Sequence, residues 1–430
     1  MTGKLHIVIV IDHASITGGQ AKVALQGAIA LKQAGYEPII FASAGPVDQR
    51  LTDAGVEVVC LGQHDLLGNP SKAAGAIQGI WNFTAAREMK KLLARLPRDR
   101  TIVHVHGWAK AMSGAFAPAV RAAGVPALYT FHEYFLFCPN GGFYDYRNNH
   151  VCKLEPLSVA CWAHNCDPRN YANKLWRGLR HMGMHDAAGM PKLFSDYIII
   201  SDFQSAIVSP RVPEGARMHR ISNPIDAEDL GRKPEPAKGD FLFVGRLSPE
   251  KGLFFFAEAA RKAGVTPVFA GDGPSADELA ARYPEARLLG WKSPAEIKQL
   301  MRDARALVFP SIWYEGQPLT VLEAKATGLP IIVSDACAGR DEVEDGKTGF
   351  WFKSQDADDL ATKLERLKDD DLIRKMSDAA YDGFWSDPPT MARHIERIGA
   401  VYADMMARRG SMVPREETRE DGAVLTPARS

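Results

Sequence analysis

The chain has 430 residues, which is more than one ordinary hydrophobic core supports and enough for two domains. Its 52 basic and 52 acidic side chains give a formal net charge of zero, which argues against binding of nucleic acid or an acidic bilayer through an overall electrostatic field. The opening MTGKLHIVIVID is too short for a secretory signal and no apolar run reaches membrane-spanning length, so we expect a cytoplasmic protein.

Short apolar runs alternate with segments of helical period through the first half of the chain, which is typical of βαβ units around a parallel sheet. The expected strands are Leu5–Ile11, Pro38–Ala42, Val56–Leu61, Ile102–Val105, Ala127–Phe131 and Tyr197–Ser201. Helical spacing fills Gln20–Ala34 and Thr84–Ala94. This series predicts one Rossmann-like domain over residues 1–230.

An insert at residues 135–167 interrupts the alternation, because it is rich in cysteine and aromatic residues and has no clear period. Its cysteines are Cys138, Cys152, Cys161 and Cys166, and they lack the paired C-x2-C spacing of common zinc sites. Three interpretations stay open: a structural zinc or other thiolate-bound metal, reduced cysteines packed as small hydrophobes, and a disulfide. The disulfide is the least favoured in a cytoplasmic protein.

A second interruption, Asn173–Phe194, is helix-like and carries the basic residues Lys174, Arg177 and Arg180. One interpretation is a solvated helix of the first domain. The other is a helix that lies on an anionic membrane surface, which would suit a lipid-linked acceptor and peripheral contact with the inner membrane face.

A second alternating series follows residues 231–240, a stretch rich in Gly, Pro and charge that is typical of an interdomain linker. Its expected strands are Phe241–Val244, Pro267–Ala270, Arg287–Leu289, Ala306–Phe309 and Pro330–Ser334. Its expected helices are Phe254–Ala263, Pro294–Arg302, Thr320–Ala326 and Ala357–Leu367. We therefore predict a second Rossmann-like domain at residues 241–388, a C-terminal helix at residues 389–408 and a disordered tail at residues 409–430.

The string PSIWYEGQPLTVLEAKATGLP at residues 310–330 holds Glu315 and Glu323, one in a loop that ends at Pro318 and one in the helix that follows. A helix N-terminus offers free N–H groups and the positive end of the helix dipole, which suit a diphosphate. Carboxylates at these places accept hydrogen bonds from ribose or sugar hydroxyls. Two such glutamates alone would more often be surface residues, and the surrounding string favours a site.

Three glycine-bearing loops follow expected strands. In GRLSPEKG (245–252), Arg246 and Lys251 are spaced to converge on one diphosphate and to stabilise the charge of a departing nucleotide, although an isolated pattern of this kind is as often a solvated basic loop. Gly18 and Gly19 open the first long helix but do not complete the G-x-G-x-x-G fingerprint of nicotinamide cofactors. GDGP (271–274) is typical of a tight turn.

Taken together, GRLSPEKG, FAGDGP, Gly290-Trp291, EGQPLTVLEAKATGLPIIVSD and EDGKTGFWF resemble the retaining glycosyltransferases of family four (group 1). The resemblance is close over Phe241–Leu367 and looser over Leu5–Ala34, Ile102–Glu133 and Tyr197–Asp226. It implies the α/β GT-B fold, in which two facing Rossmann-like domains hold a nucleotide-sugar donor in the cleft between them. The first domain would be the acceptor side, the second would be the donor domain, and the C-terminal helix would cross back to the first.

The resemblance also implies a set of donor-binding residues. They are Gly18, Gly19, Arg246, Lys251, Glu315, Gly316, Gln317, Pro318, Leu319 and Glu323. Arg246 and Lys251 would grip the diphosphate. Glu323 would bind the ribose, and Glu315 would contact the transferred sugar. Gln317 stands where the family usually has phenylalanine, which bears on donor preference.

His132, in the string Thr130-Phe131-His132-Glu133, matches the family's histidine at a strand end and completes the implied catalytic set with Arg246, Lys251 and Glu315. Without the resemblance it would be interpreted as a satisfied histidine at the end of a strand. His104 and His106 alternate on one expected strand, so their side chains are expected on opposite faces, with His106 toward the cleft.

The implied reaction moves a sugar, with retention at the anomeric carbon, from a nucleotide-diphosphate sugar to a hydroxyl of a sugar or lipid-linked acceptor in bacterial surface polysaccharide or glycolipid assembly. The acceptor hydroxyl would attack on the face that the nucleotide leaves. The insert follows His132 directly, so we expect it near the acceptor, where it would help to select it. No Asp-x-Asp stands at the end of an expected strand, so catalysis is expected without a divalent cation.

Other functions stay open at this point. An inactive GT-B-type sugar-binding protein and a nucleotide-sugar epimerase are the main alternatives. A pyridoxal phosphorylase is disfavoured because no cofactor lysine is marked out, and a nicotinamide dehydrogenase is disfavoured because the glycine fingerprint is incomplete.

Overall fold

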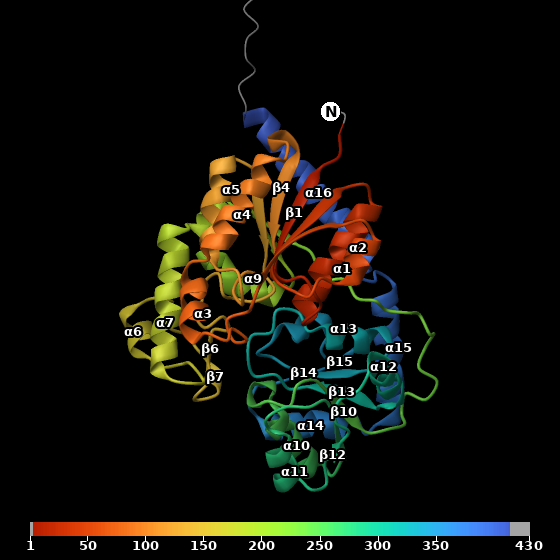
Figure 1. Ribbon diagram of the computed structural model, residues 1–430. Coiled ribbons are helices and arrows are strands. Elements are labelled where there is room, and N and C mark those ends of the chain that lie inside the picture. Colours follow the sequence, from red (N-terminus) through yellow and green to blue (C-terminus); the bar gives the residue numbers. More distant parts are fainter. Residues whose placement is uncertain (1–2, 413–430) are drawn as a thin grey trace, which may run out of the picture.

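Two parallel sheets organise the chain in the computed structural model, which describes residues 3–412 (Figure 1). We call them the N-terminal sheet and the C-terminal sheet. Helices cover both, and a cluster of buried apolar side chains lies on each face of each sheet. The predicted α/β class with two Rossmann-like sheets is confirmed.

The N-terminal sheet has the strand order β3-β2-β1-β4-β5-β8-β9, and all of its strand pairs are parallel. Its strands are β1 (His6–His13), β2 (Glu37–Ala44), β3 (Glu57–Gln63), β4 (Thr101–Val105), β5 (Ala127–Thr130), β8 (Asp196–Ile199) and β9 (Arg217–Arg220). Strand β9 was not predicted from the sequence. Its residues RMHR form a basic edge strand and lack the apolar run of a strand that is buried on both faces.

The C-terminal sheet has the order β12-β11-β10-β13-β14-β15, which is the third-second-first-fourth-fifth-sixth order of a Rossmann fold. Its strands are β10 (Phe241–Val244), β11 (Pro267–Ala270), β12 (Arg287–Leu288), β13 (Ala306–Phe309), β14 (Ile331–Ser334) and β15 (Gly349–Phe352). Only β15 is absent from the predicted set, since its four residues are too few to show a period and Trp351 is exposed.

Apart from the last helix of the chain, the helices that cover the N-terminal sheet or lie beside it precede residue 210. They are α1 (Gly19–Gln33), α2 (Gln49–Asp53), α3 (Lys72–Ile80), α4 (Phe83–Ala94), α5 (Ala117–Ala123), α6 (Val159–Ala163), α7 (Tyr171–Met182), α8 (Met190–Leu193) and α9 (Asp202–Val208). A small hairpin of β6 (Tyr144–Asp145) and β7 (His150–Val151) lies in the insert. The helices of the C-terminal sheet are α10 (Leu253–Ala263), α11 (Ala276–Arg282), α12 (Pro294–Asp303), α13 (Leu319–Ala326), α14 (Ala357–Arg366) and α15 (Asp370–Trp385).

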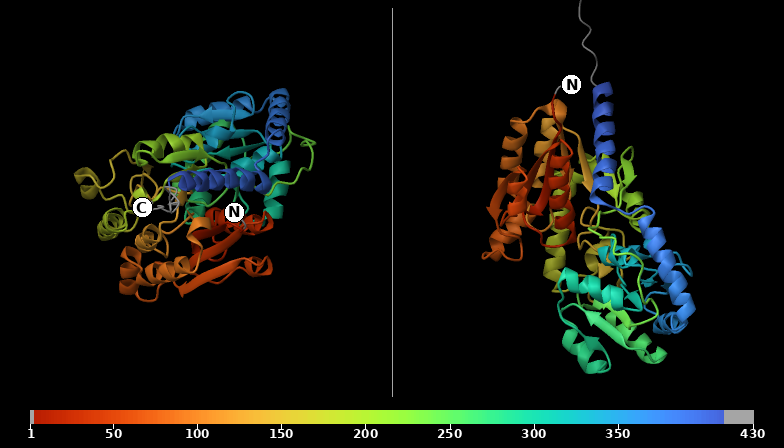
Figure 2. Two further views of the ribbon diagram at one scale, coloured as in Figure 1. Left: turned by 90° about the horizontal axis from the view of Figure 1, so that it is seen from above. Right: turned by 90° about the vertical axis from the view of Figure 1, so that its right-hand side faces the viewer.

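The last helix, α16 (Met391–Met412), returns to the N-terminal sheet, as Figure 2 shows. Its side chains Ile395, Ile398 and Tyr402 are buried in the same apolar cluster as Ile9 of β1. The helix continues past residue 408, where its end was expected, and the remainder of the predicted tail, residues 413–430, lies outside the described residues. The predicted domain boundaries themselves stay a prediction.

The chain passes between the two sheets twice, and the two passages touch each other. The backbone N–H of Ile225 donates to the carbonyl of Pro389 at 3.0 Å. Residues 231–240, expected as a linker, pack instead on the C-terminal sheet, where Lys233 is 4% exposed and its ammonium donates to the carbonyl of Met301 at 3.4 Å. Movement between the sheets would therefore be concentrated near Ile225 and Pro389.

The basic helix-like segment turns two of its basic side chains inward. It divides into α7, one π-helical turn and α8, and Lys174 and Arg180 are 2% and 8% exposed. The outward-facing stripe of α7 is apolar instead, with Leu175 and Leu179 exposed. These basic side chains are therefore available neither to solvent nor to lipid.

An ion pair fixes α16 to the N-terminal sheet. Asp196 on β8 is fully buried, and its two carboxylate oxygens lie 2.7 and 2.8 Å from the guanidinium of Arg408. His219 donates to the same carboxylate at 2.8 Å, when its Nε2 carries the proton.

We expect Asp196→Asn to lower the free energy of unfolding by about 2–4 kcal/mol, because it removes the fully buried counter-charge of the Arg408 guanidinium. Equilibrium urea unfolding measures this loss. The matched control is Asp404→Asn, which removes a 3.0 Å contact to the same guanidinium from an exposed carboxylate and should cost less than about 1 kcal/mol. Equal losses in the two variants would contradict this account.

Candidate active site

Loops from both sheets meet where a Rossmann fold binds its ligands. The strand order reverses between β1 and β4 in the N-terminal sheet and between β10 and β13 in the C-terminal sheet. In folds of this kind, ligands bind beyond the carboxyl ends of the strands at the point of reversal. Gly19, after β1, lies against the side chain of Leu319, after β13: a Cβ on Gly19 would be 3.5 Å from Leu319 Cδ1. A Cβ on Gly316 would lie 3.2 Å from the carbonyl oxygen of His132, after β5. The residues predicted from the two domains are thus neighbours in space.

The carboxylate of Glu315 is held by three donors. Lys251 Nζ lies 2.6 Å from Oε1, Trp313 Nε1 donates to the same oxygen at 2.7 Å, and Ser311 Oγ donates at 3.0 Å. The ammonium also lies 5.3 Å from the centre of the Trp313 ring, in a cation–π contact. Glu315 and Lys251 are 12% and 22% exposed, so the pair is only partly open to solvent.

Glycines let the loops of the C-terminal sheet come this close. Gly252, with φ 72°, precedes α10, and a Cβ there would lie 1.9 Å from the carbonyl oxygen of Pro310. A Cβ on Gly273 would lie 2.4 Å from the carbonyl oxygen of Leu247. The backbone N–H of Leu247 donates to the carbonyl of Asp272 at 2.9 Å, so the GRLSPEKG and GDGP loops support each other. Only glycine fits at these close approaches.

Two helix N-termini face each other beside Glu315. Helices α1 and α13 begin after Gly18 and Pro318, and neither first turn receives a hydrogen bond from a capping side chain among the described residues. Uncapped N–H groups and two positive dipole ends therefore point into the same region, which favours an anion.

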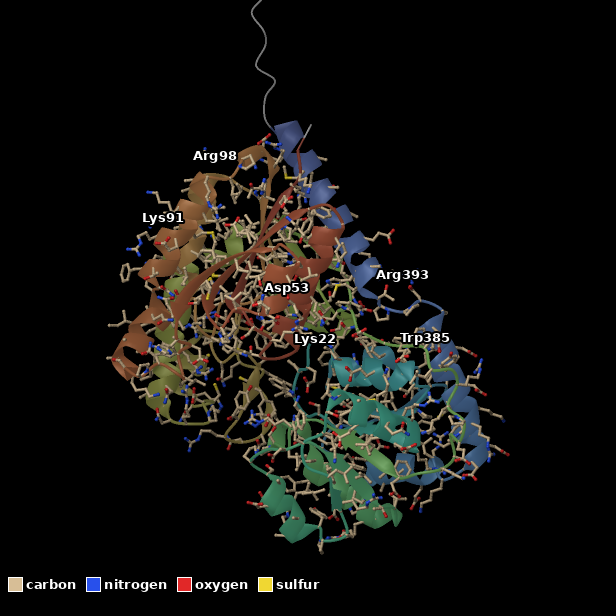
Figure 3. All side chains as sticks on the ribbon, turned by 45° about the vertical axis from the view of Figure 1, so that its right-hand side comes forward. Lys22, Asp53, Lys91, Arg98, Trp385 and Arg393 are labelled. Atoms are coloured by element: carbon tan, nitrogen blue, oxygen red, sulfur yellow. The ribbon has the colours of Figure 1, made fainter. Side chains whose placement is uncertain are left out.

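Lys22 and Glu323 lie beside these helix starts and belong to different sheets. Figure 3 shows Lys22 at the end of α1 that faces the C-terminal sheet. Burial raises the pKa of Glu323, and the nearby charge of Lys22 opposes that rise. The guanidinium of Arg246 is exposed and makes no hydrogen bond or ion pair within the described residues. It is therefore free to accept a ligand.

The side chain of Gln317 is held by two hydrogen bonds within the protein. Its Oε1 accepts the backbone N–H of Asn223 at 2.8 Å, and its Nε2 donates to Glu342 at 3.0 Å. The amide therefore joins α13 to the passage between the sheets. Any contact of Gln317 with a donor would have to come from its backbone.

Behind His132 lies a group of buried histidines. The His132 Nε2 is 3.0 Å from the Nδ1 of His106, and the His106 ring lies 4.1 Å from that of His104. The expectation that these last two side chains point to opposite faces is wrong, because β4 ends at Val105 and the chain turns before His106. Burial lowers the pKa of His132 to about 3 and that of His394, on α16, to about 4.

Sequence reasoning missed four residues that complete this arrangement. Ser311 and Trp313 stand in the same string as Glu315, so their spacing offered a signal. Lys22 follows Gly18 by one helical turn, and this spacing offered a weaker signal. Glu133 offered no such signal: it is half-buried, accepts a hydrogen bond from the Tyr129 hydroxyl at 2.9 Å, and burial raises its pKa to about 7.

The insert contacts the loop that carries Glu315. A Cβ on Gly142 would lie 3.4 Å from the ring of Trp313, and the hydroxyl of Tyr134 donates to the Glu315 carbonyl at 3.5 Å. The insert therefore lies against the loop of Trp313 and Glu315 from the side of the N-terminal sheet.

The described part of the chain carries neither a convergent metal site nor a disulfide. Within residues 3–412, no three His, Cys, Asp or Glu side chains converge closely enough to hold a metal ion. All six cysteines are unpaired. Over the same residues, no helix combines the length and apolar character needed to cross a membrane.

Two family models match the chain. Residues 18–155 match the glycosyl transferase 4-like domain, and residues 228–383 match the glycosyl transferases group 1. The chain is 30% identical over 357 residues to the UDP-Gal:alpha-D-GlcNAc-diphosphoundecaprenol alpha-1,3-galactosyltransferase of Escherichia coli, with 76% of this chain and 82% of the relative covered. It is also 30% identical over 304 residues to the GDP-mannose-dependent alpha-mannosyltransferase of Corynebacterium glutamicum, with 69% and 66% covered.

Solved structures with the same fold include enzymes and a nucleotide complex. Anabaena HepE in complex with UDP has a TM-score of 0.65 at 16% identity, with 93% of this chain and 100% of that chain covered. The sucrose-phosphate synthase of Thermosynechococcus elongatus has a TM-score of 0.66 at 15% identity, with 94% and 100% covered. At these identities the likeness shows the fold.

Because burial lowers the pKa of His394 to about 4, the unfolded chain binds more protons than the folded chain between about pH 4 and 6.5. The free energy of unfolding therefore falls as the pH falls through this window. We expect His394→Asn, which keeps a donor for the carbonyl of Ser222, to reduce that slope by about 1 kcal/mol per pH unit between pH 5 and 6. Urea unfolding at the two pH values measures it. The same substitution at the exposed His64 is the control. A dependence of the unfolding free energy on pH that is unchanged in His394→Asn would refute the prediction.

Proposed function

The chain belongs to the retaining glycosyl transferases of group 1, family four, and we propose that it moves a hexose from a UDP-sugar to a hydroxyl of a saccharide carried on a lipid diphosphate. Family membership favours transfer over the epimerase, phosphorylase and dehydrogenase alternatives. The observation that carries the proposal is the Lys251–Glu315 pair beside two facing, uncapped helix N-termini. The galactosyltransferase relative, whose name specifies a UDP-sugar and a diphosphoundecaprenol acceptor, supports the choice of substrates.

The donor diphosphate would bind at the N-termini of α1 and α13, beside Gly19 and Leu319. Their helix N-termini supply N–H groups, the exposed Arg246 adds a mobile cation, and Lys251 adds a second one. These groups would stabilise the charge that grows on the departing UDP, so we propose that catalysis needs no divalent cation. Glu323 would accept hydrogen bonds from the ribose hydroxyls.

The transferred sugar would lie between Glu315 and His132. Lys251, Ser311 and Trp313 all bind Glu315 Oε1, which leaves Oε2 to accept a sugar hydroxyl. Because His132 is neutral above about pH 3 and its Nε2 contacts another histidine, its Nδ1 would bond to the sugar without adding positive charge near the anomeric carbon. The acceptor hydroxyl would then attack from the face that UDP leaves, with retention.

The acceptor would approach along the insert and α7. The insert lies against Trp313, which supports our proposal that it helps to select the acceptor. On α7, Tyr171, Leu175, Leu179 and Met182 are exposed at the spacing of one helical face, with Ile77 exposed on the neighbouring α3. An apolar stripe of this kind suits contact with the membrane that carries a lipid-linked acceptor, which would place the enzyme at the inner membrane face.

We expect UDP and UDP-hexoses to raise the melting temperature of the protein, because a ligand at a hundred times its Kd adds about 2.7 kcal/mol to its stability. Arg246→Ala and Glu323→Ala should each weaken UDP binding about 10- to 100-fold, through loss of a charge-assisted hydrogen bond. Thermal shift over a UDP concentration series measures both. Arg374→Ala, which removes an exposed guanidinium on α15, is the matched control.

Stabilisation by GDP-sugars and none by UDP would contradict the donor assignment. Hydrolysis or transfer assays should give the same rate after treatment with EDTA as before it. Activity that EDTA abolishes and only added Mg²⁺ or Mn²⁺ restores would contradict catalysis without a divalent cation.

We expect the protein to sediment with phosphatidylglycerol vesicles and the double variant Leu175→Asn/Leu179→Asn to bind them at least tenfold more weakly, since burying one large apolar side chain contributes about 1.5–3 kcal/mol. The exposed Val47 lies after β2, away from α7, so Val47→Asn tests whether loss of any exposed apolar side chain has this effect. Vesicle binding that the double variant leaves unchanged, or none by the native protein, would rule out α7 as the contact.

A further inference from the structure

A single hydrogen bond holds the ring of His132. This side chain is half-buried beyond the end of β5, and within residues 3–412 its one hydrogen bond joins its Nε2 to the Nδ1 of His106 at 3.0 Å. The two rings are stacked, with their centres 5.2 Å apart and an angle of 23° between their planes. The Nδ1 of His132 is therefore the ring nitrogen that remains for a ligand.

The backbone of His106 is fixed from two sides. Its N–H donates to the carbonyl of Val10, on β1, at 2.9 Å, and its carbonyl accepts a hydrogen bond from the side-chain amide of Gln20, on α1. Gly107 allows this approach, because a Cβ there would lie 2.5 Å from Gln20 Nε2. The position of His106 beyond β4 is thus defined by the neighbouring strand and by the helix that follows it.

The ring of His106 lies on a second ring that is itself fixed. The centres of the His104 and His106 rings are 4.1 Å apart, and the two residues are 1% and 4% exposed. His104 is bound at both ring nitrogens, with Tyr402 Oη of α16 at 2.7 Å from Nδ1 and Thr130 Oγ1 of β5 at 2.7 Å from Nε2. A ring held at both nitrogens does not turn, so it gives His106 a rigid surface to pack against.

The bond between His106 and His132 contains one proton. Burial lowers the pKa of both rings, so each is neutral at neutral pH and carries one N–H. If the Nε2 of His132 accepts this proton, its own N–H is on Nδ1; if the Nε2 donates, Nδ1 is an acceptor. In either case the partner ring determines what His132 Nδ1 offers to a ligand.

We propose that His106 is a positioning residue that holds the His132 ring in one orientation and one tautomer, with Nδ1 directed at the transferred sugar. This role rests on the proposed function, in which His132 contacts that sugar near the anomeric carbon. His106 is buried and acts through His132. A displacement of the contacting group by about 1 Å can cost roughly 100-fold in rate, so a rigid support behind His132 matters for turnover.

The test compares two variants at His106 that differ in polarity and share one shape. Asparagine and leucine branch at Cγ, and the asparagine amide places a donor or an acceptor close to the former Nδ1. We expect His106→Leu to lower kcat for release of UDP from a UDP-hexose by about 10- to 100-fold, and His106→Asn by less than about threefold. The Kd for UDP, from thermal shift, should change by less than about twofold in both, because His132 contacts the sugar.

The control is His6→Leu, which removes a histidine from the amino end of β1, at the opposite edge of the N-terminal sheet from the site. It should change neither kcat nor the Kd for UDP. Equal losses of kcat in His106→Leu and His106→Asn, or a loss in neither, would overturn the proposal, because a side chain that only fills space responds to shape and not to polarity.

A second measurement does not depend on turnover. Nitrogen NMR of protein labelled isotopically at its histidine rings reports the tautomer of His132, whose signals are assigned by their loss in His132→Asn. We expect one tautomer in the native protein and averaged shifts of two tautomers in His106→Leu. Averaged shifts in the native protein would overturn the proposal. A single tautomer in a protein that neither binds UDP nor turns over a UDP-sugar would support the positioning by His106 and reject only the proposed function.

Discussion

The Lys251–Glu315 pair connects most of what distinguishes this site. Its two residues come from the loops after neighbouring parallel strands, β10 and β13, and they meet because Gly252 lets one loop pass within contact of Pro310 in the other. A carboxylate that accepts three donors on one oxygen keeps a fixed orientation and presents its second oxygen. The pair also lets the two charges neutralise each other in this partly buried place.

The two sheets are joined by few polar contacts, and those contacts lie around the site. Besides the bond between Gln317 and Asn223, the carboxylate of Asp341 accepts the backbone N–H of Phe203 at 2.8 Å, at the start of α9. Arg340 lies 4.9 Å from the Phe203 ring. A small set of contacts at one edge, with both chain passages near Ile225, is the arrangement expected of a hinge that closes over a donor and excludes water.

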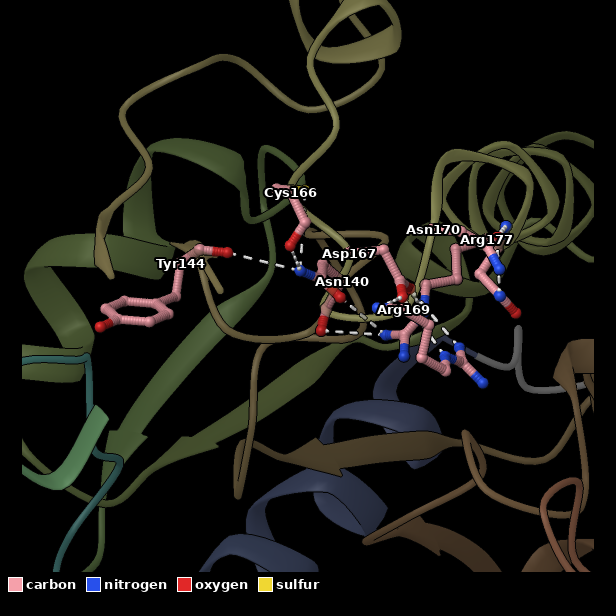
Figure 4. Close-up of polar contacts among 8 residues, drawn as sticks. Asn140, Tyr144, Cys166, Asp167, Arg169, Asn170 and Arg177 are labelled. Atoms are coloured by element: carbon pink, nitrogen blue, oxygen red, sulfur yellow. Dashed lines mark hydrogen bonds and ion pairs between the residues drawn. The ribbon is translucent and has the colours of Figure 1, made fainter. Parts of the chain in front are cut away.

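Burial sets the charge of several side chains on the N-terminal side of the site. It keeps His132 and the histidines behind it neutral, which lets them lie in van der Waals contact without repulsion. In the insert, the buried ammonium of Lys174 donates to Cys161 Sγ at 3.2 Å, and the buried carboxylate of Asp167 pairs with Arg177 at 2.8 Å (Figure 4). Polar contacts of this kind tie the insert, which has little core of its own, to α7.

The sequence alone determined the fold class and most strands of both sheets, and it predicted Arg246, Lys251, Glu315 and Glu323 as candidate site residues, because apolar period and loop motifs are local properties of the chain. The tertiary structure decided what depends on distant segments. It brought His104 beside His106 since β4 ends one residue earlier than an unbroken strand would, and it directed the Gln317 amide to Asn223. It also turned the basic face of α7 inward, because the buried cysteines and carboxylates that accept those cations belong to a loop whose path no local pattern specifies.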